Sequence, residues 1–492
     1  MLRTKIVCTI GPASHELETL IHLIEAGMDV ARLNFSHGDH AWHAETIGRV
    51  RAAAAVTQHP VAILADLQGP KLRVGQLPEE GVHLEPGALV TLSPRPVADR
   101  PGSIPVQFDQ LAQAVQVGDP ILLDDGLLEL RVREVREDQV VCVIVTGGLL
   151  TSHKGMNLPN VAIGIPAITE KDEEDLRFAL AQGVDWVALS FVRQAEEVVR
   201  LRSLIERWDQ GGNPPPIIAK IEKPEGVRNI DAIIAVADGI MVARGDLGIE
   251  TAPEAVPMMQ KDIIARCNRA GVPVITATQM LDSMIRNPRP TRAEASDVAN
   301  AILDGTDAIM LSGETAMGAY PIASVATMAR IAAEAERALK VGERAFCHPD
   351  VIAEAVAHAS VDTASHLQAA AIIAPTVSGF TARLLSHFRP SCPIIAVTPD
   401  PVVQRRLTLY WGVEPLLAPR ATVTDVMIAD AVRAAQAHGY VQPGQTVVIV
   451  AGSAGAPPGT TDFMRVQKLA RSEDPLVHAE TRRRGGTKMT LL

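Results

Sequence analysis

Eight short apolar runs recur along the chain up to about residue 311, and helix-like stretches such as Leu17–Ala26 and Ala293–Leu303 lie between them. Most of these runs are apolar throughout, which is typical of parallel strands buried on both faces of a sheet. Eight strand–helix repeats predict a (β/α)8 barrel of the TIM type, with an open doubly wound sheet as the alternative. The expected strands are Lys5–Ile10, Val30–Phe35, Val61–Asp66, Trp186–Phe191, Ile217–Glu222, Gly239–Ala243, Val274–Ala277 and Ala308–Leu311.

One interval in this alternation, between the third and fourth expected strands, is much longer than the others. Its short β-rich runs are separated by Gly, Pro and Asp, which favour turns. We therefore expect a small β-barrel domain over residues 69–165, inserted in the third βα loop. Because active sites of such barrels form at the carboxyl ends of the strands, a domain inserted there is placed to act as a lid. Its expected strands are Val82–Leu92, Ile121–Leu123, Leu127–Val135 and Val140–Val145.

A second α/β domain is expected after the barrel. The barrel, over residues 1–68 and 166–342, ends with the Ala-rich helical pattern Ile322–Leu339. Alternation then resumes and predicts an α/β domain over residues 343–470. Residues 471–492 are expected to form a disordered tail, with a basic anion-binding arm at Arg482–Arg484 as the alternative. The expected elements are helices 351–367, 380–388, 402–411 and 424–438 and strands Ala371–Ala374, Ile394–Val397 and Thr446–Ala451.

The composition argues against several classes of protein. The chain has 46 Lys and Arg residues against 57 Asp and Glu, and this net charge of −11 disfavours a general nucleic-acid binder. No apolar run is long enough to span a membrane, and the first residues do not form a signal-peptide core. The five cysteines are scattered without a C-x-x-C pair, which argues against a disulfide framework and favours the cytoplasm.

Polar or ionic residues follow most of the expected barrel strands at their carboxyl ends, where barrel active sites form. Such groups are costly to bury alone, so we expect them to partner one another and a charged ligand. In strand order, the segments are Arg32–Gly38, Asp66, Lys220–Glu222, Arg244–Gly248, Thr276–Gln279 and Ser312–Thr315.

Glu222 and Asp246 come from adjacent strands and are expected to meet. Two carboxylates are typical of a Mg²⁺ site, and ion pairs with neighbouring cations are the alternative. Lys220 points to the same side of its strand as Glu222 because the two are separated by one residue. This lysine suits a phosphoryl or enolate oxyanion, with a Schiff base as the alternative. Arg32 is expected to be either a phosphate fork or a structural ion pair.

The turn around Asp246 carries Gly245 and Gly248, whose exposed N–H groups are suited to an anion such as a carboxylate. Neither a phosphate-binding P-loop nor a dinucleotide fingerprint occurs in the sequence. His37 is expected either to contact a nucleotide or to cap a helix.

These strand ends belong to longer motifs, which follow one another along the chain. They are Thr9-Ile10-Gly11-Pro12-Ala13-Ser14, Ala31-Arg32-Leu33-Asn34-Phe35-Ser36-His37-Gly38, Lys154-Gly155-Met156-Asn157-Leu158-Pro159, Lys220-Ile221-Glu222, Ala243-Arg244-Gly245-Asp246-Leu247-Gly248, Ala277-Thr278-Gln279-Met280-Leu281 and Leu311-Ser312-Gly313-Glu314-Thr315-Ala316. With them the chain resembles the pyruvate kinase family over about residues 3–470. The likeness is to the bacterial type, without the N-terminal helical extension or an appended C-terminal phosphotransfer-like domain.

The resemblance implies transfer of a phosphoryl group from phosphoenolpyruvate to ADP, giving pyruvate and ATP, with Mg²⁺ or Mn²⁺ as cofactor. It further implies a role for each matching residue. Glu222 and Asp246 would hold the divalent metal; Lys220, Arg32, Thr278, Ser312 and Glu314 would be catalytic; Arg32, Lys220, Gly245, Asp246 and Thr278 would bind the substrate; Asn34, His37, Arg73 and Lys154 would bind the nucleotide; and Asn34, Ser36, Asp66 and Leu67 would form a monovalent-cation site.

One position departs from the family pattern. Lys71 stands where K⁺-dependent members have a glutamate, and Leu67 and Gln68 replace the usual Thr and Lys. The ammonium group of Lys71 is expected to replace the monovalent cation, so K⁺ is not expected to be required.

In the last domain, the loop after an expected strand carries hydroxyls and opens a helix, which suits an anion, with a plain capping turn as the alternative. The resemblance implies a phosphorylated allosteric effector there, held by Thr376, Ser378, Gly379 and Thr381, and a homotetramer. A Mg²⁺-dependent barrel lyase or aldolase and a catalytically silent sensor are the competing functions. The intact set of Lys220, Glu222, Asp246 and Thr278 argues against the sensor.

Overall fold

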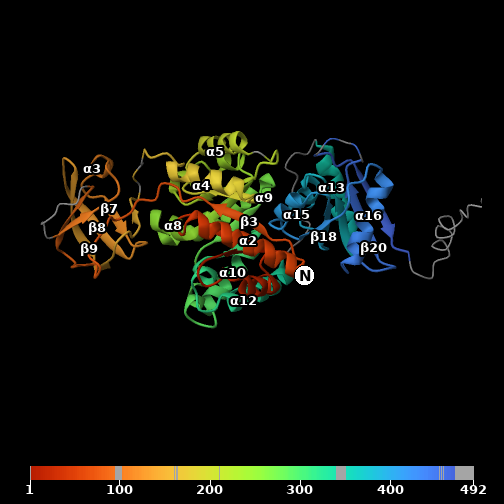
Figure 1. The fold of residues 1–492 in the computed structure, drawn as a ribbon, viewed down its shortest axis with the longest axis horizontal. Helices are drawn as coiled ribbons and strands as arrows, with labels where there is room; N and C mark the ends of the chain where they lie inside the picture. The colour runs from red at the N-terminus through yellow and green to blue at the C-terminus, as the bar shows by residue number, and fades with distance from the viewer. Residues whose placement is uncertain are drawn as a thin grey trace, which may run out of the picture. The chain divides into compact units, whose positions relative to one another are not determined.

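The computed structural model describes residues 2–94, 102–159, 161, 164–209, 211–339, 351–453, 455, 457 and 459–470. The expected boundary near residue 343 and the expected tail at 471–492 lie outside the described residues. The chain divides into two compact units, of which one contains Ile6–Thr57 and Ile63–Ile331. The other contains Met1–Lys5, Gln58–Ala62 and Ala332–Leu492. Figure 1 colours both by residue number.

The first unit contains a closed barrel of parallel strands, as the apolar runs predict. Around the barrel the strand order is β1-β16-β15-β14-β13-β12-β3-β2. Their bounds are β1 Lys5–Thr9, β2 Val30–Asn34, β3 Ala62–Asp66, β12 Trp186–Leu189, β13 Ile217–Ile221, β14 Gly239–Ala243, β15 Val274–Ala277 and β16 Ala308–Leu311. All eight expected strands are confirmed, and β12 ends early because Phe191 takes a left-handed φ of 55°.

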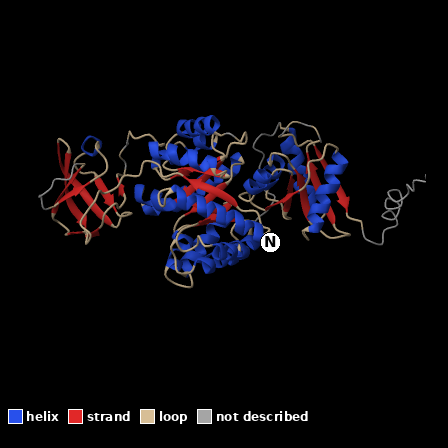
Figure 2. Ribbon diagram, viewed as in Figure 1, coloured by secondary structure: helices blue, strands red, loops and turns tan. Residues whose placement is uncertain are grey.

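Helices follow the barrel strands, and Figure 2 shows them around the sheet. Thr169 and Thr291 cap α4 and α10 through reciprocal capping boxes with Asp172 and Glu294. The expected helix Ile322–Leu339 is helical to Ala335 and then tightens into a 3₁₀ turn. The helices are α1 Leu17–Ala26, α2 His40–Thr57, α4 Glu170–Ala181, α5 Ala195–Trp208, α6 Pro224–Arg228, α7 Ile230–Ile234, α8 Arg244–Glu250, α9 Val256–Ala270, α10 Arg292–Leu303, α11 Gly313–Ala316 and α12 Pro321–Ala335, with 3₁₀ turns at Pro253–Ala255, Asp282–Ile285 and Glu336–Ala338.

The insertion between β3 and β12 is a β-domain, as expected, and its strands form a curled sheet of order β11-β7-β8-β9-β5-β6 and a ribbon of β10 and β4. The single expected strand Val82–Leu92 is wrong, because a turn that contains Gly87 (φ 83°) divides it. The sequence did not predict β6, β10, β11 or α3. The bounds are β4 Val82–Leu84, β5 Leu89–Ser93, β6 Ser103–Pro105, α3 Leu111–Ala114, β7 Pro120–Leu123, β8 Leu128–Arg136, β9 Gln139–Thr146, β10 Gly148–Leu150 and β11 Met156–Asn157.

The second unit contains a five-stranded sheet of order β19-β18-β17-β20-β21, in which β21 is antiparallel to β20. The expected helix 402–411 is too long, because α15 ends at Leu407 and the chain turns at Gly412 (φ 69°) into the unexpected strand β19. The elements are α13 Ile352–His366, β17 Ala371–Pro375, α14 Phe380–His387, β18 Ile394–Thr398, α15 Pro401–Leu407, β19 Val413–Leu417, α16 Thr424–Ala437, β20 Thr446–Ala451 and β21 Phe463–Lys468.

Four cysteines lie in the described residues, and all four are buried and free: Cys8, Cys142, Cys267 and Cys392. Cys347 lies outside the described part of the chain. The described thiols therefore agree with the expectation that the chain has no disulfide framework.

Candidate active site

Charged side chains from β2, β3 and β13 meet in one buried cluster. The Nε atom of Arg32 lies 2.6 Å from Oδ2 of Asp66, and Nζ of Lys220 lies 3.1 Å from Oδ1 of the same carboxylate. The Lys220 ammonium is also 3.1 Å from Oε1 of Glu222. Each of the four residues is at most 8% exposed. The strand ends therefore do partner one another, as the cost of burying single charges requires.

The cluster shifts the pKa values of its members in different directions. Burial raises the pKa of Asp66, but the charges of Lys220 and Arg32 outweigh it and hold that pKa below its ordinary value. Burial lowers the pKa of Lys220, yet the carboxylates of Asp66 and Glu222 raise it overall. Burial, with repulsion from Asp246 and Asp66, raises the pKa of Glu222 despite Lys220. Glu222 and its acidic neighbours would therefore accept a further positive charge.

Two residues that follow β12 support this cluster, and the sequence did not single out either of them. The Ser190 hydroxyl accepts a hydrogen bond from Nζ of Lys220 at 2.7 Å and donates to the carbonyl of Leu67 at 2.7 Å. The N–H of Phe191 donates to Oε2 of Glu222 at 2.6 Å. The place of Ser190 at a strand end could have indicated a role in the site. Its residue type did not, because a serine carries no charge.

The ends of β14 and β15 are joined through Thr278. Its hydroxyl accepts a hydrogen bond from the N–H of Gly245 at 2.7 Å and donates to the carbonyl of Ala277 at 2.6 Å. Thr278 and Gln279 both take left-handed backbone conformations, with φ values of 69° and 53°. Gly245 and Asp246 open α8, so the structure brings Thr278 to the first turn that the sequence predicted as an anion site.

After β16, Glu314 is 2% exposed and accepts hydrogen bonds from the N–H groups of Leu281, at 3.0 Å, and Ser312, at 2.8 Å. Burial raises the pKa of this carboxyl group. The hydroxyl oxygen of Ser312 is buried and has no hydrogen-bond partner within the described residues. Glu314 therefore links the loop that follows β16 to the loop that follows β15.

The expected monovalent-cation residues occupy the ends of β2 and β3. The side-chain oxygen of Asn34 accepts a hydrogen bond from the N–H of Ser36 at 3.1 Å, and Leu67 is buried. The side chain of Lys71 does not point toward these residues but toward Gly155. Its Cε lies 3.4 Å from the position that a Cβ atom on Gly155 would occupy. Among the described residues, no ion pair or hydrogen bond joins Lys71 to Asp66, whose carboxylate contacts Arg32 and Lys220.

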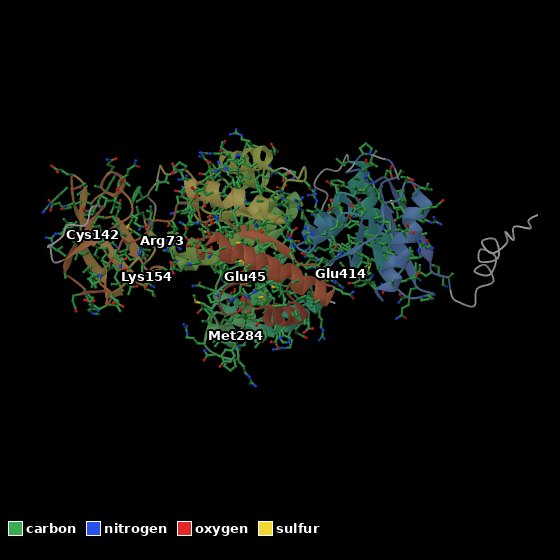
Figure 3. The ribbon with its side chains drawn as sticks, in the orientation of Figure 1. Glu45, Arg73, Cys142, Lys154, Met284 and Glu414 are labelled. Carbon is green, nitrogen blue, oxygen red and sulfur yellow. The ribbon has the colours of Figure 1, made fainter. Side chains whose placement is uncertain are left out.

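Two of the expected nucleotide residues, Arg73 and Lys154, lie at the connections between barrel and lid, whereas Asn34 and His37 lie at and after the end of β2. Arg73 donates from Nη1 to the carbonyl of His153 at 3.1 Å, which puts it beside Lys154 (Figure 3). Nζ of Lys154 lies 2.8 Å from Oδ1 of Asp124. Burial, followed by the charges of Arg73, Lys71 and Arg32, lowers the pKa of His37. His37, Arg73 and Lys71 therefore belong to one positively charged region.

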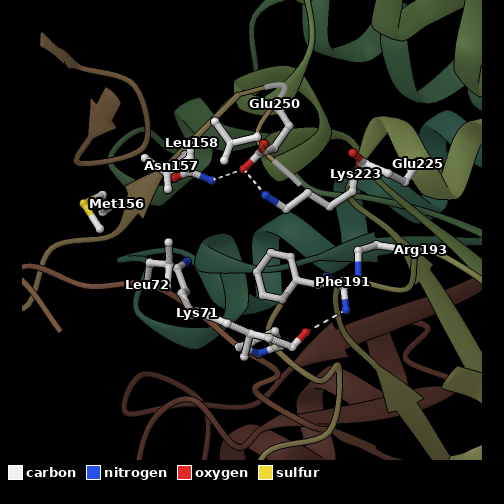
Figure 4. A pocket seen from close by; sticks show the side chains of 13 residues that line it. Lys71, Leu72, Met156, Asn157, Leu158, Phe191, Arg193, Lys223, Glu225 and Glu250 are labelled. Atoms are coloured by element: carbon white, nitrogen blue, oxygen red, sulfur yellow. Dashed lines mark hydrogen bonds and ion pairs between the residues drawn. The ribbon is translucent and has the colours of Figure 1, made fainter. Parts of the chain in front are cut away.

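A cavity lies where the lid connections meet the barrel, and Figure 4 shows its lining. Oε1 of Glu250, at the end of α8, accepts hydrogen bonds from Nδ2 of Asn157 at 2.8 Å and Nζ of Lys223 at 2.6 Å. Lys71 also lines this cavity, but Lys220, Glu222 and Asp246 do not. The cavity is thus beside the ionic cluster and not its substrate pocket.

A second pocket belongs to the C-terminal unit. Thr376, Ser378 and Thr381 line it, and the facing residues include Arg420, Ser453 and Thr460. The hydroxyl of Thr376 accepts a hydrogen bond from the N–H of Gly379 at 3.0 Å, and Thr381 exchanges one with Thr461 at 2.8 Å. The expected effector residues therefore surround one pocket, with Gly379 at the helix start behind it.

The closed barrel and the buried ionic cluster at its strand ends define an enzyme of the (β/α)8-barrel class. The family description "Pyruvate kinase, barrel domain" matches residues 1–325, and "Pyruvate kinase, alpha/beta domain" matches residues 354–467. The chain belongs to the pyruvate kinase family and is a phosphotransferase.

Named relatives agree with this family over almost the whole chain. The pyruvate kinase of Geobacillus stearothermophilus is 49% identical over 474 residues, which are 95% of this chain and 80% of the relative. The pyruvate kinase of Clostridium acetobutylicum is 46% identical over 472 residues, which are 95% of this chain and 99% of the relative. Within the described residues, no helix has the length and apolar character needed to cross a membrane.

Proposed function

We propose that this chain transfers the phosphoryl group of phosphoenolpyruvate to ADP and so forms pyruvate and ATP. The observation that carries the proposal is the buried cluster of Arg32, Asp66, Lys220 and Glu222 at the mouth of a family-typical barrel. The test is a coupled assay for pyruvate formation with and without ADP. Pyruvate formed only with ADP is expected, and pyruvate formed without ADP would instead indicate a lyase or aldolase.

Lys220 and Arg32 supply positive charge to the transferring group. Phosphoryl transfer depends on positioning and charge neutralisation more than on covalent help from the protein. Both cations are already held by Asp66, and Lys220 also by Ser190, so little reorganisation accompanies the reaction. Lys220 also stabilises the enolate of pyruvate that phosphoryl loss leaves behind.

Glu222 and Asp246 hold Mg²⁺, and Mn²⁺ can replace it. The donor set fits, because both side chains are carboxylates, which supply the hard oxygen ligands that Mg²⁺ prefers. No group of three or more His, Cys, Asp or Glu suited to a metal occurs among the described residues. Water and substrate oxygens would complete the coordination of an ion held by two carboxylates. The bound ion neutralises charge on the phosphoryl group. Removal of divalent metal with a chelator should abolish activity.

Thr278, with the N–H groups of Gly245 and Asp246, binds the substrate carboxylate at the start of α8. The contact between the Gly245 N–H and the Thr278 hydroxyl supports this assignment, because it gathers these groups at one point. Ser312 and Glu314 serve the proton path to the enolate carbon. The Ser312 hydroxyl, which is buried and has no hydrogen-bond partner in the part of the chain that the structure describes, and the raised pKa of Glu314 support a protonation role.

Asn34, His37, Arg73 and Lys154 bind the nucleotide, with Lys154 and Arg73 arriving from the lid connections. The shared positive region around His37 supports this placement of the polyphosphate. Closure of the lid over the barrel mouth would exclude water and so prevent hydrolysis of the phosphoryl donor.

Lys71 makes the enzyme independent of K⁺ by placing a tethered positive charge near Asn34, Ser36, Asp66 and Leu67. The support is its position five residues after Asp66, with a positive charge where K⁺-dependent relatives have a negative one. For this to hold, the Lys71 side chain must turn away from Gly155 when substrates bind.

The C-terminal pocket binds a phosphorylated effector through Thr376, Ser378, Gly379 and Thr381. Its support is the gathering of hydroxyls, Arg420 and the start of α14 around one pocket. The active form is a cytoplasmic homotetramer, which rests on the family alone and is tested by sedimentation of the purified protein.

A further inference from the structure

Arg244, the first residue of α8, has a largely buried guanidinium group that reaches across to the end of β15. Its Nη2 donates to the carbonyl of Thr278 at 2.8 Å, and its Nε lies 3.4 Å from the carbonyl of Ala277. Nη1 contacts Oδ1 of Asp297 at 2.7 Å and Oε1 of Gln260 at 3.3 Å. The side chain is only 10% exposed, so these contacts use most of its hydrogen-bonding capacity in one place.

The carbonyls that Arg244 holds belong to a strained turn. Thr278 has a φ of 69° and Gln279 a φ of 53°, which puts two consecutive non-glycine residues in the left-handed region. A β-branched residue is a marked outlier there, and such a conformation persists only where its surroundings enforce it. The guanidinium of Arg244 is a direct restraint on the backbone of this turn.

The same restraint fixes the side chain of Thr278. Arg244 binds its carbonyl, and the next residue, Gly245, donates its N–H to the Thr278 hydroxyl at 2.7 Å. The first two residues of α8 thus hold Thr278 from its backbone and from its side chain. Neither the position nor the rotamer of the hydroxyl is free once both contacts form.

We propose that Arg244 is a positioning residue that sets the Thr278 hydroxyl at the substrate carboxylate by holding the left-handed turn after β15. The proposal rests on the proposed function, in which Thr278 touches the substrate. Asp297 fixes the guanidinium in turn. A lysine could not replace it fully, because one ammonium lacks the planar fork that meets two carbonyls and a carboxylate together.

The direct test is the crystal structure of Arg244→Gln. We expect Thr278 to leave the left-handed region and the contact between its hydroxyl and the Gly245 N–H to be lost. Retention of the positive φ at Thr278 in this variant would overturn the proposal. This readout needs no activity, so it stands even if the phosphoenolpyruvate assay of the wild-type protein fails.

Steady-state kinetics then test whether the left-handed turn at Thr278 affects the reaction. Because small misplacements of a positioning group cost up to about 100-fold, we expect Arg244→Gln to lose roughly 10- to 100-fold in kcat/KM for phosphoenolpyruvate. The KM for ADP should stay within about twofold, and Arg244→Lys should recover part of the loss. An equal loss for both substrates would contradict a role through Thr278. Arg266→Gln is the matched control, because Arg266 is an α9 arginine with two carboxylate partners, Asp262 and Asp231.

A double-mutant cycle separates positioning from general stability. If Arg244 acts through Thr278, the Arg244→Gln substitution should cost little further in a Thr278→Ala background. A full, additive loss in that background would show that Arg244 acts by another route and would overturn the proposal.

Discussion

The barrel mouth and the pocket of the C-terminal unit are both built at the carboxyl ends of parallel strands, yet they use opposite kinds of polar group. At the mouth, Arg32, Asp66, Lys220 and Glu222 are buried ions in mutual contact. Among the described residues that line the pocket, neutral hydroxyls such as Ser378 are the commonest polar groups, and one cation, Arg420, and one carboxylate, Asp430, join them. The mouth has its charges arranged before any ligand arrives, whereas the pocket offers hydroxyls that fit many anions.

This difference predicts where substitutions act. A preorganised ionic site stabilises charge that develops in the transition state, so its loss lowers turnover. A hydroxyl-lined pocket binds a ligand without taking part in the chemistry, so its loss should change regulation alone. The predictions below test this division, beginning with the largest expected effect.

Replacement of Lys220 by methionine should have the largest effect. The variant keeps an unbranched side chain, one atom shorter, and removes the charge. We expect kcat to fall by about 10³-fold or more, since loss of one preorganised donor alone costs about 10²–10³. The measurement is steady-state kinetics at saturating substrates, with circular dichroism to check the fold. Lys261→Met is the control, because Lys261 forms an ion pair with Asp304 on the exposed side of α9. Near-wild-type turnover of Lys220→Met would contradict the division between a catalytic barrel mouth and a regulatory C-terminal pocket.

Glu222→Gln and Asp246→Asn should each raise the Mg²⁺ concentration for half-maximal activity. Each replaces an anionic oxygen ligand by a neutral amide, so we expect a shift of about tenfold or more, comparable with other losses at metal sites. The measurement is a Mg²⁺ titration at fixed substrates, with Glu254→Gln, an exposed carboxylate, as control. An unchanged titration in both variants would mean that the metal is held elsewhere.

The fold was largely predictable because buried parallel strands leave continuous apolar runs. Most of the eight barrel strands have this signature, as β12 (Trp186–Leu189) and β14 (Gly239–Ala243) show. The two strands that were missed in the C-terminal unit lack it: β19 contains Glu414 and Pro415, and β21 is an edge strand with only partly covered side chains. The lid strand was drawn too long because apolar residues continue on both sides of the Gly87 turn.

The charged residues of the candidate site could be predicted from the sequence. Lys220 and Glu222 are charged residues at one strand end, and their contact follows from the alternation of side chains along a strand, which points both to the same side. Ser190 and Arg244 were missed as functional residues, because a serine carries no charge and the role of Arg244 depends on a backbone conformation at Thr278. Side-chain direction was also beyond the sequence, as Lys71 shows by lying against Gly155.

Lys71→Glu tests whether the ammonium group of Lys71 replaces K⁺ at the barrel mouth. Wild-type activity in K⁺-free buffer, with tetramethylammonium keeping the ionic strength constant, should change less than about twofold on adding KCl. The variant changes the local charge by two units and should acquire a K⁺ requirement of roughly tenfold in rate, because the new carboxylate and Asp66 are both negative and would together attract the cation. Lys71→Gln serves as the neutral control. Strong activation of the wild-type enzyme by KCl would refute K⁺ independence, and an unchanged Lys71→Glu would point to Leu67 and Gln68 as further requirements.

Ser378→Glu should have the smallest effect on basal turnover and is therefore the sharpest test of the division between the sites. Ser378 is exposed in its pocket, whereas Thr381 is 3% exposed and bonded to Thr461, so a charge at Thr381 would also disturb packing. A carboxylate at position 378 repels a phosphate through like charge, and activation by sugar phosphates or nucleoside monophosphates should be lost. The unactivated rate should stay within about twofold of the wild type, because no residue of the barrel mouth is altered.

Ser378→Gln, with the same size and no charge, should keep part of the activation. Persistent activation of Ser378→Glu at an unchanged half-saturating concentration would place the effector elsewhere, and a fall in basal kcat like that of Lys220→Met would end the distinction between a catalytic mouth and a regulatory pocket.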